Sequence, residues 1–530
     1  MKRNLLGISL LTITGLYLLL FAIIILVTII LGAPVIIGVG ISIVILILQF
    51  LLSPFFTDLS MKWFYKANFN SELPEYLKKF IEEICQKENM KYPRMGFIDD
   101  GAPNAFTYGH TKNDARIIIT RGILDLLTED EVKAVVGHEL GHAVHYDMLF
   151  MTVAQLVPLV LYGIYDVLTS TKDNSSNNKD SGQAAIIGLI AYVLYIISNY
   201  IVLWLSRTRE YYADSYSIEA TKNPNALASA LVKVGYGLTT NSDKKSRVAK
   251  SNSLGIFDSK TSKSLVVTSY DNGKISPEHI KNAMKWEEWN IWAKWFQLNS
   301  THPLISKRLL AISARSNEFN QEPYIVFDYK KEESYVDDFL VELLINFLPS
   351  IVLIIGIGVS IFVMSSKETL LPIGITLFLV VLTSYIKFNR KHPNKDYNNT
   401  NVRDLLNIVK VSGITAIPCT LEGTVIGRGD PGYIFNEDMT IQDETGIIFL
   451  DYNQPLFIIN KVFALLKNKD NIDKKIKVQG WYRRSPVPYV EIKTYEVDGK
   501  VKKVFTYPLA KGFYIFLFII SILFLVFSLI

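Results

Sequence analysis

The chain has 530 residues, of which 49% are hydrophobic and 20% charged, with a formal net charge of +5. This small net charge excludes bulk electrostatic attraction to nucleic acid. Two cysteines, Cys85 and Cys419, are too few for a disulfide framework or a cysteine-based zinc site. Apolar runs alternate with ordinary charged segments, which is typical of a polytopic α-helical membrane protein with water-facing domains.

Runs long enough to cross a membrane occur from the N-terminus onward. Residues 5–31 are almost continuously apolar; a spanning helix needs about 20 such residues, whereas a signal-peptide core needs only about 7–15. A second run covers 35–54, so we expect residues 1–54 to form a transmembrane hairpin. Further spans are expected at about 148–170 and 186–206, in a second hairpin at 339–387 and in a C-terminal helix at 509–530, about seven in all.

Basic residues predict the orientation of these spans. Lys and Arg precede the first run, at Lys2 and Arg3, and follow the sixth, at Lys387 and Arg390, whereas the short loops on the other side contain few cations. Cytosolic loops are enriched in Lys and Arg. We therefore expect three segments on the cytosolic face: residues 55–147, 207–338 and 388–508.

The strongest motif is His138-Glu139-Leu140-Gly141-His142, an H-E-x-x-H sequence. Residues four apart share a helical face, so the two imidazoles can bind one zinc ion, with Glu139 as general base toward a water molecule whose pKa the metal lowers. The helix is predicted by Thr128 and Glu131, a capping-box pair, and should run from about residue 129 to 146. One catalytic zinc ion per chain is the expectation; a structural pair of core histidines is the alternative.

A catalytic zinc site needs a third protein ligand. His145 is not expected to serve, because the longer H-E-x-x-H patterns need Gly and His where this chain has His145 and Met148. A better candidate is Glu210, at the end of the fourth expected span, with Asp214 one helical turn later. One carboxylate could bind zinc while the other hydrogen-bonds a ligating imidazole, although spacing alone does not distinguish this from an exposed charged helix.

Several blocks, in order, resemble the membrane-bound M48 metalloproteases, the group of the bacterial protease HtpX and the CAAX prenyl proteases. The ordered set covers about residues 1–315 and is far more specific than H-E-x-x-H alone. The resemblance implies a mainly α, zincin-type (gluzincin) protease domain over residues 55–330. The matching blocks are the P-N-A-F element at 103–106, residues 121–131, the zinc helix with Asp147, residues 206–214, and Thr301-His302-Pro303 with Arg308.

The resemblance also implies roles around the metal. Glu210 becomes the third zinc ligand, and Asp214 and Arg207 are expected beside the ligands. His302 is expected to stabilise the oxyanion of the tetrahedral intermediate. A histidine before proline can equally be a structural turn residue, so this alternative stays open.

The same resemblance implies how substrate binds. Asn104, Ala105 and Phe106 are expected to contact it, and residues 115–120, rich in β-branched side chains, are expected to form an edge strand that pairs with an extended polypeptide. Such pairing gives main-chain affinity with little sequence preference. The implied substrates are membrane or misfolded proteins.

Two features lie between these blocks and the C-terminal region. Residues 240–275 are polar and aperiodic, and are expected to be a flexible excursion or a lid. Trp286, Trp289, Trp292 and Trp295 repeat every three residues. They are either an interfacial belt or substrate groove wall, or aromatic packing on a helix, which we favour.

Residues 402–500 are predicted to be a β-rich, OB-like soluble domain. Three strands, a helix-like stretch at 456–467 and two strands follow the order of an OB barrel. No strand face interleaves aromatic and basic residues, so no nucleic acid is expected, and a protein partner with a recruiting or regulatory role is our interpretation. The expected strands are 406–412, 418–427, 439–451, 475–483 and 488–497.

Together these features predict a zinc-dependent, membrane-bound endopeptidase acting in membrane-protein quality control. The resemblance implies a prokaryotic plasma membrane, with the active site on the cytosolic face. Processing of a defined substrate, such as a prenylated C-terminus, is an alternative of the same class. A non-catalytic scaffold with a relict zinc site is a different class, and the intact Glu139 argues against it because such a site needs no base.

Overall fold

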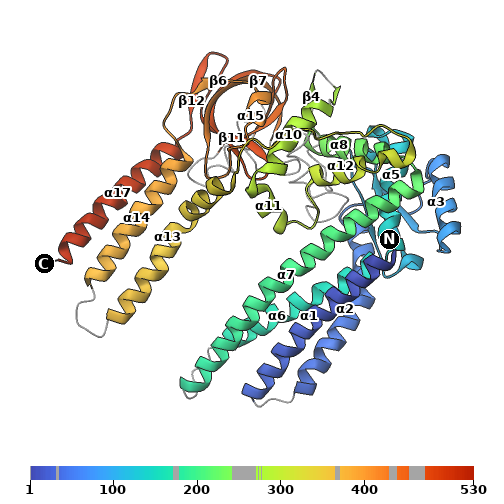
Figure 1. Ribbon diagram of the computed structural model, residues 1–530, viewed down its shortest axis with the longest axis horizontal. Helices are drawn as coiled ribbons and strands as arrows, with labels where there is room; N and C mark the ends of the chain where they lie inside the picture. Colours follow the sequence, from blue (N-terminus) through green and yellow to red (C-terminus); the bar gives the residue numbers. More distant parts are fainter. Residues whose placement is uncertain are drawn as a thin grey trace. The chain divides into compact units, whose positions relative to one another are not determined.

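The computed structural model describes residues 2–31, 35–170, 178–240, 270–271, 274–275, 277–363, 370–428, 439–452 and 472–529 (Figure 1). The expected excursion at 240–275 lies almost entirely outside these residues, and the helix-like stretch at 456–467 lies wholly outside them. The chain divides into two compact units. Unit 1 consists mainly of Met1–Gly237 and Gln297–Val326, and unit 2 mainly of Lys260–Phe296 and Phe327–Ile530.

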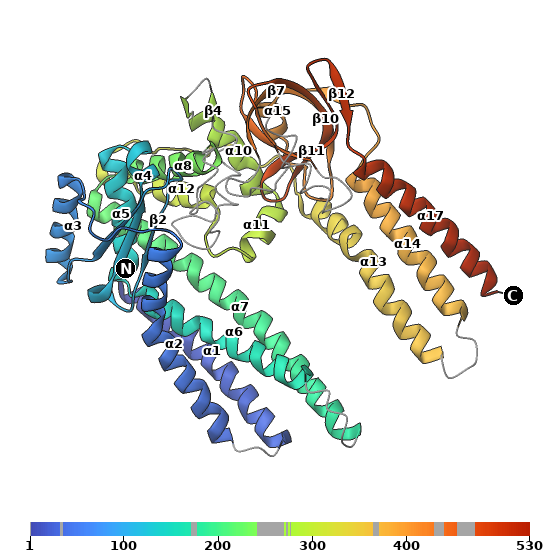
Figure 2. The same ribbon diagram turned by 180° about the vertical axis from the view of Figure 1, so that it is seen from behind.

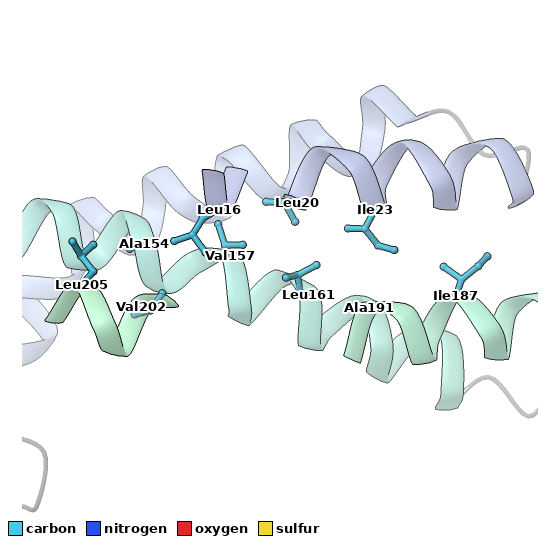
Figure 3. Packing of buried hydrophobic residues seen from close by; sticks show 10 residues of the cluster. All are labelled: Leu16, Leu20, Ile23, Ala154, Val157, Leu161, Ile187, Ala191, Val202 and Leu205. Carbon is cyan, nitrogen blue, oxygen red and sulfur yellow. The ribbon is translucent and has the colours of Figure 1, made fainter. Parts of the chain in front are cut away.

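Four long helices of unit 1 lie side by side: α1 (Lys2–Leu31), α2 (Val35–Trp63), α6 (Asp147–Ser170) and α7 (Asn178–Thr221) (Figure 1 and Figure 2). Apolar side chains at helical spacing form a shared seam between three of these helices. Outward-facing side chains are also apolar, as in Leu11, which is 78% exposed. Apolar surface all round a helix is typical of contact with lipid. The seam consists of Leu16, Leu20 and Ile23 of α1, Ala154, Val157 and Leu161 of α6, and Ile187, Ala191, Val202 and Leu205 of α7 (Figure 3).

Six helices among the described residues are long and apolar enough to cross a membrane. The second expected span, 35–54, lies within α2, where many side chains are outside the described part of the chain. A seventh span therefore stays a prediction. The six candidates are Asn4–Val27, Asp147–Thr169, Ala184–Thr221, Val336–Val363, Leu370–Lys391 and Thr506–Phe527.

The length of α7 exceeds what a membrane requires. It has 44 residues, which at 1.5 Å per residue is about 66 Å, roughly twice the hydrocarbon thickness of a bilayer. Its apolar part gives way to charged residues from Arg207 onward. The C-terminal part of α7 therefore projects beyond the lipid as part of the water-facing domain.

A three-stranded sheet contains β1 (Arg94–Ile98), β2 (Ala105–Tyr108) and β3 (Arg116–Thr120) in the order β1-β3-β2. The expectation that residues 115–120 form an edge strand is wrong, because β3 pairs with both neighbours and all its residues are buried. Its β-branched run reflects burial on both faces. Among the described strands, β2 pairs only with β3, so the strand that starts in the P-N-A-F element is an edge strand.

The loop after β2 is fixed to α2 at a proline. α2 continues past its expected end to Trp63 with Pro54 inside it. Since proline has no N–H, the carbonyl of Phe50 loses its helical partner. The His110 Nε2 donates to this carbonyl at 2.9 Å, while its Nδ1 lies 2.6 Å from a carboxylate oxygen of Asp114.

The H-E-x-x-H motif lies on α5 (Glu129–Val144), and the predicted capping box is confirmed. The Thr128 N–H donates to the Glu131 carboxylate at 2.8 Å, and the Glu131 N–H donates to the Thr128 hydroxyl. Tyr146, with φ of 58°, turns the chain from α5 into α6. The shorter elements of unit 1 are α3 (Glu75–Glu88), η1 (Lys112–Asp114), α4 (Arg121–Leu126), α8 (Pro224–Thr240), α12 (Ile305–Ser313) and η2 (Ser316–Phe319).

Unit 2 contains the other three helices of membrane-spanning length, α13 (Val336–Val363), α14 (Leu370–Lys391) and α17 (Thr506–Phe527). α17 packs beside α14 through aromatic rings, with the Phe388 and Tyr514 centroids 5.1 Å apart. The shorter elements are α10 (Pro277–Trp289), α11 (Ile291–Leu298), β4 (Tyr270–Asp271), β5 (Lys274–Ile275) and α15 (Val402–Leu406).

The regularly spaced tryptophans do not share one helix, because Asn290 separates α10 from α11. Trp286 is fully buried, and its Nε1 donates to the carbonyl of Val411 at 2.8 Å. The Trp292 Nε1 donates to the Glu342 carboxylate on α13 at 2.5 Å. For Trp286 and Trp292 the packing interpretation is therefore correct.

The C-terminal β-domain is a closed barrel. Five strands follow one another around it in the order β7-β8-β9-β11-β10, and β10 pairs back to β7. β9 and β11 are parallel, and the other adjacent pairs are antiparallel. The strands are β6 (Asn398–Asn399), β7 (Ile417–Arg428), β8 (Met439–Gln442), β9 (Ile447–Asp451), β10 (Lys475–Arg484), β11 (Pro488–Val497) and β12 (Lys500–Lys503).

Two of the expected strands differ from the structure. Residues 406–412 are not a strand, because α15 ends at Leu406 and an irregular segment follows. The expected strand 439–451 is two strands, since the Asp443 carboxylate accepts hydrogen bonds from the N–H groups of Thr445 and Gly446 and folds a turn. The apolar content of residues 439–451 alone did not predict this turn, because a hydrogen-bonding side chain forms it.

Candidate metal centre

The two histidines of the motif project from one face of α5. His138 is fully buried and His142 partly buried, and their Nε2 atoms are 3.1 Å apart. With Glu210 on α7 they offer three ligand atoms that all lie within 4.8 Å of one another. In the part of the chain that the structure describes, this is the one group of three such side chains able to hold a metal ion.

Close packing of α5 against α7 brings Glu210 to the histidines. A Cβ at Gly141 would lie 3.1 Å from the Ala213 Cα, so glycine at this motif position permits the approach. The Glu210 Oε2 lies 3.5 Å from the His138 Nε2, and its Oε1 lies 3.6 Å from the His142 Nε2. One carboxylate therefore faces both imidazoles.

Each imidazole is oriented by a second carboxylate on its other nitrogen. The His138 Nδ1 lies 2.9 Å from an oxygen of Asp214, and the His142 Nδ1 lies 2.6 Å from an oxygen of Asp147. Such outer partners fix the ring orientation and leave Nε2 for a metal. Asp214 has the place expected from the sequence, whereas Asp147 was noted only as part of a motif and had no predicted role.

Arg308 on α12 joins the carboxylates of Asp214 and Glu210, a role that was not predicted from the sequence. It is 1% exposed; its Nε and Nη2 donate to the two oxygens of Asp214 at 2.9 and 2.7 Å. Its Nη1 lies 3.5 Å from Glu210. Burial alone would lower the pKa of Arg308, but the two carboxylates raise it, so the guanidinium stays charged. Its place in the matching block with Thr301-His302-Pro303 was the one available signal.

His302 lies at the same site. Its Nε2 is 3.5 Å from the Glu210 Oε1, and its Nδ1 is 2.9 Å from the Thr301 hydroxyl. Arg207, expected beside the ligands, instead donates to the carbonyls of Gln297 and Ser300, each at 2.8 Å. These carbonyls lie at and beyond the C-terminal end of α11, where no following helical turn supplies N–H donors. Arg207 supplies donors instead and so holds the segment that leads to His302.

Glu139 is 2% exposed and faces β2. The Thr107 hydroxyl lies 2.7 Å from the Glu139 Oε2 and 3.1 Å from its carbonyl oxygen. Thr107 was not predicted as a site residue, because nothing in its sequence context marks it. The edge strand and the predicted general base are thus joined directly.

The side chains of the predicted substrate-binding residues are buried. Ala105 is 0% and Phe106 6% exposed, and Phe106 packs in a cluster with Ile118. The Asn104 side chain accepts a hydrogen bond from the Ala105 N–H. Any contact of Ala105 and Phe106 with an extended substrate would therefore use the main chain of β2 rather than these side chains.

The donor set fits a zinc ion. Two imidazole nitrogens and one carboxylate oxygen are the ligands of one class of catalytic zinc site. The Glu210 Oε2 and the Glu139 Oε1 are buried oxygens without a hydrogen-bond partner among the described residues. A buried acceptor left unpaired costs free energy, so these atoms are consistent with a bound cation and with a polar reactant beside it.

The electrostatics of the site also favour positive charge between the rings. Burial alone would lower the pKa of His138, but the Asp214 and Glu210 carboxylates outweigh it and raise that pKa to about 9. A divalent cation bound between the rings would supply the positive charge that these carboxylates stabilise. Binding it requires neutral imidazoles, so metal uptake and proton release are coupled.

Comparison with known proteins gives one family. The model of peptidase family M48 matches residues 71–316. An HtpX protease homolog of Methanothermobacter thermautotrophicus is 40% identical over 190 residues, which cover 36% of this chain and 69% of that protein. A homolog of Picrophilus torridus is 28% identical over 282 residues, covering 52% of this chain and 82% of that protein.

Among solved structures, that of Ste24p from S. mikatae matches with a TM-score of 0.33 and 19% identity, over 58% of this chain and 66% of that chain. A similarity of this size adds no structural argument. The family match ends at residue 316, so the barrel lies outside it. The identity and coverage of the Methanothermobacter relative, with the family match, show that the chain belongs to peptidase family M48 and is HtpX-like.

Proposed function

We propose that this membrane protease is a zinc-dependent endopeptidase whose metal is held by His138, His142 and Glu210. One observation carries the proposal: three ligand atoms from two helices lie within 4.8 Å of one another, beside the buried carboxylate of Glu139. A zincin-type (gluzincin) arrangement, with histidines from an H-E-x-x-H helix and a later glutamate, follows from the same residues.

Zinc bound there would act as a Lewis acid on the scissile carbonyl and would make water more acidic. Glu139 takes a proton from the attacking water and returns it to the leaving amine nitrogen, so water is added across the peptide bond. The Thr107 hydroxyl keeps the Glu139 carboxylate aimed at this position. His302 donates a hydrogen bond to the oxyanion, a role that its distance of 3.5 Å from Glu210 supports.

Substrate is proposed to add to the outer edge of β2 as an extended strand. β2 begins at Ala105 and its Thr107 contacts Glu139, so a strand on this edge would run past the general base. Main-chain pairing gives affinity with little side-chain preference. Binding with little side-chain preference suits unfolded or misfolded polypeptides, because their main-chain N–H and C=O groups are free to pair. In folded proteins these groups are already hydrogen-bonded.

The location follows from the membrane helices. Lys2 and Arg3 begin α1, and Arg390 and Lys391 end α14, which supports a cytosolic active site by the distribution of positive charge. A site at the membrane surface suits substrates released from the bilayer. We therefore propose a role in membrane-protein quality control at a prokaryotic plasma membrane.

The barrel is proposed to be OB-like and to recruit a protein partner. Its closed strand order, with β7 pairing both β8 and β10, supports this assignment. The basic residues Arg483 and Arg484 are buried rather than displayed. Nucleic acid is therefore not the proposed partner.

The test compares the full-length wild type with Glu139→Gln in detergent, on an unfolded membrane protein. Loss of the general base should lower kcat by about 10²–10⁴-fold without preventing zinc binding. Glu129→Gln, at an exposed position on the same helix, is the matched control and should keep wild-type activity. Chelation should abolish the wild-type rate, and zinc should restore it.

Equal rates for wild type and Glu139→Gln would refute the proposal, as would full activity after chelation. Cleavage confined to prenylated peptides would replace the quality-control role with processing of a defined substrate. Metal analysis of the purified protein completes the test, with one zinc ion per chain expected.

A further inference from the structure

The most deeply buried charge of α7 lies outside the catalytic group. Arg209 is 1% exposed and contacts three other parts of unit 1. Its Nη1 donates to the Ser9 hydroxyl of α1 at 2.5 Å, and its Nη2 donates to the His145 carbonyl at 2.9 Å. The same Nη2 forms an ion pair with the Asp147 Oδ1 at 2.5 Å.

Asp147 continues this set of contacts toward the metal site. Its other oxygen, Oδ2, lies 2.6 Å from the Nδ1 of His142, the ring that offers Nε2 to a metal. Asp147 is 5% exposed, so water does not replace Arg209 as its partner without a rearrangement. Four side chains on four helices therefore connect α1 to a candidate ligand: Ser9, Arg209, Asp147 and His142.

We propose that Ser9 and Arg209 are positioning residues for the metal site, so that the N-terminal membrane helix α1 sets the orientation of the His142 imidazole. The inference rests on the proposed zinc site. Ser9 lies close to the start of α1, at the end of the helix that carries Lys2 and Arg3. A membrane helix thereby contributes to a catalytic centre with which it shares no ligand.

The physical reason is the fixed fork of the guanidinium. Its N–H groups lie in one plane at fixed angles, so the acceptor on Nη1 helps to decide where Nη2 can meet Asp147. Ser9 is well suited to this task, because its own hydroxyl donates to the Leu5 carbonyl at 2.8 Å and leaves its lone pairs directed to Arg209. Without Ser9 a buried N–H loses its acceptor, and Arg209 is free to move away from its ion pair with Asp147.

The experiment measures zinc affinity of the full-length protein by competition with a chromogenic chelator, independently of activity. Asp147→Asn should weaken zinc binding by about 10–100-fold, the usual effect of an outer-shell partner. Ser9→Ala, two contacts further away because Arg209 lies between Ser9 and Asp147, should weaken it by about 3–10-fold. Ser9→Thr keeps the hydroxyl and should restore wild-type affinity.

Thr12→Val is the matched control. Thr12 lies one turn further along α1, and among the residues that the structure describes its hydroxyl bonds only within its own helix, to the Ile8 carbonyl at 2.7 Å. Its zinc affinity should equal that of the wild type. Thermal unfolding of the metal-free Ser9→Ala and Thr12→Val proteins tests whether a substitution in α1 weakens the fold in general. Such an effect would lower the unfolding temperature of both variants.

The second measurement asks whether the effects of Ser9→Ala and Arg209→Lys on zinc affinity add together. Arg209→Lys keeps a positive charge but lacks the fork, so adding Ser9→Ala to it should change the zinc affinity no further. Wild-type affinity in Ser9→Ala, or fully additive effects in the double variant, overturns this inference alone. A wild type that binds no zinc overturns the proposed function as well.

Discussion

At the scale of single residues, the site is a set of buried charges that stabilise one another. Asp214 orients His138 and is held by Arg308, which also lies near Glu210. Because these groups are withdrawn from water, each charge depends on its partner more than a surface charge would. The orientation and charge of the candidate ligands His138 and Glu210 therefore depend on the neighbouring Asp214 and Arg308.

Arg308→Leu should lower the free energy of unfolding by about 3–5 kcal/mol, because Asp214 is left as an uncompensated buried charge. Chemical denaturation of the metal-free protein measures the effect. Arg315→Leu on the neighbouring segment, where the pair with Glu318 is solvent-exposed, should cost no more than about 1 kcal/mol. A double variant with Asp214→Asn should recover part of the loss; equal costs for both arginines would contradict the prediction.

At the scale of elements, α5 is anchored at its start as well as at the end that carries the H-E-x-x-H motif. Glu131 closes the capping box and also accepts hydrogen bonds from Ser229 at 2.6 Å and from Lys233 at 2.9 Å, both on α8. One carboxylate thus sets both the first turn of the zinc-motif helix and its contact with a neighbour.

Glu131→Gln should reduce stability at neutral pH by about 1–2 kcal/mol. Burial alone would raise the pKa of Glu131, but the bonds from Lys233, Ser229 and the Thr128 backbone lower it below its ordinary value. A lowered pKa contributes stability above the ordinary carboxyl value of about 4.3, and that stability is lost as pH falls through the folded-state pKa. Thermal unfolding from pH 7 to 3 should show wild type and variant converging in acid; a constant difference would argue against the ion pair.

Phe106→Ala tests whether β2 acts through its main chain. Because Phe106 is buried, the variant should lose about 3–5 kcal/mol of unfolding free energy. The kcat/KM of the folded fraction on an unfolded substrate should stay close to wild type. A large rise in KM with unchanged stability would instead assign the side chain to substrate binding.

At the scale of the whole molecule, the two units are interleaved along the sequence. The chain passes from unit 2 into unit 1 between Phe296 and Gln297, and returns between Val326 and Phe327. The segment that carries His302 and Arg308 is therefore covalently joined to unit 2 at both ends.

Two thermal transitions are expected, one for each unit. Zinc at about 100 times its Kd should stabilise unit 1 by about 2.7 kcal/mol and leave the other transition in place. Trp286→Ala should lower only the transition of unit 2, because Trp286 packs there against Arg484, 4.5 Å from its ring. Calorimetry of the full-length protein measures both; one transition that responds to zinc and to Trp286→Ala together would contradict independent units.

By itself, the sequence determined the features that depend on local pattern. Long apolar runs specify membrane helices, Thr128 and Glu131 specify the start of α5, and the spacing of His138 and His142 places two imidazoles on one face. Each is a short-range consequence of helical periodicity or backbone capping. The resemblance of the ordered motifs then identified the family and named Glu210 as the candidate third ligand.

Only the tertiary structure decided the features that depend on contacts between distant segments. β3 became central rather than an edge because β1 and β2 both pair with it. Arg207 turned to loop carbonyls, whereas Arg308 and Thr107 joined the site from separate elements. Asp147 gained its role by lying between His142 and Arg209. No local period encodes such partners, since they are fixed by how buried polar groups find one another when the helices pack.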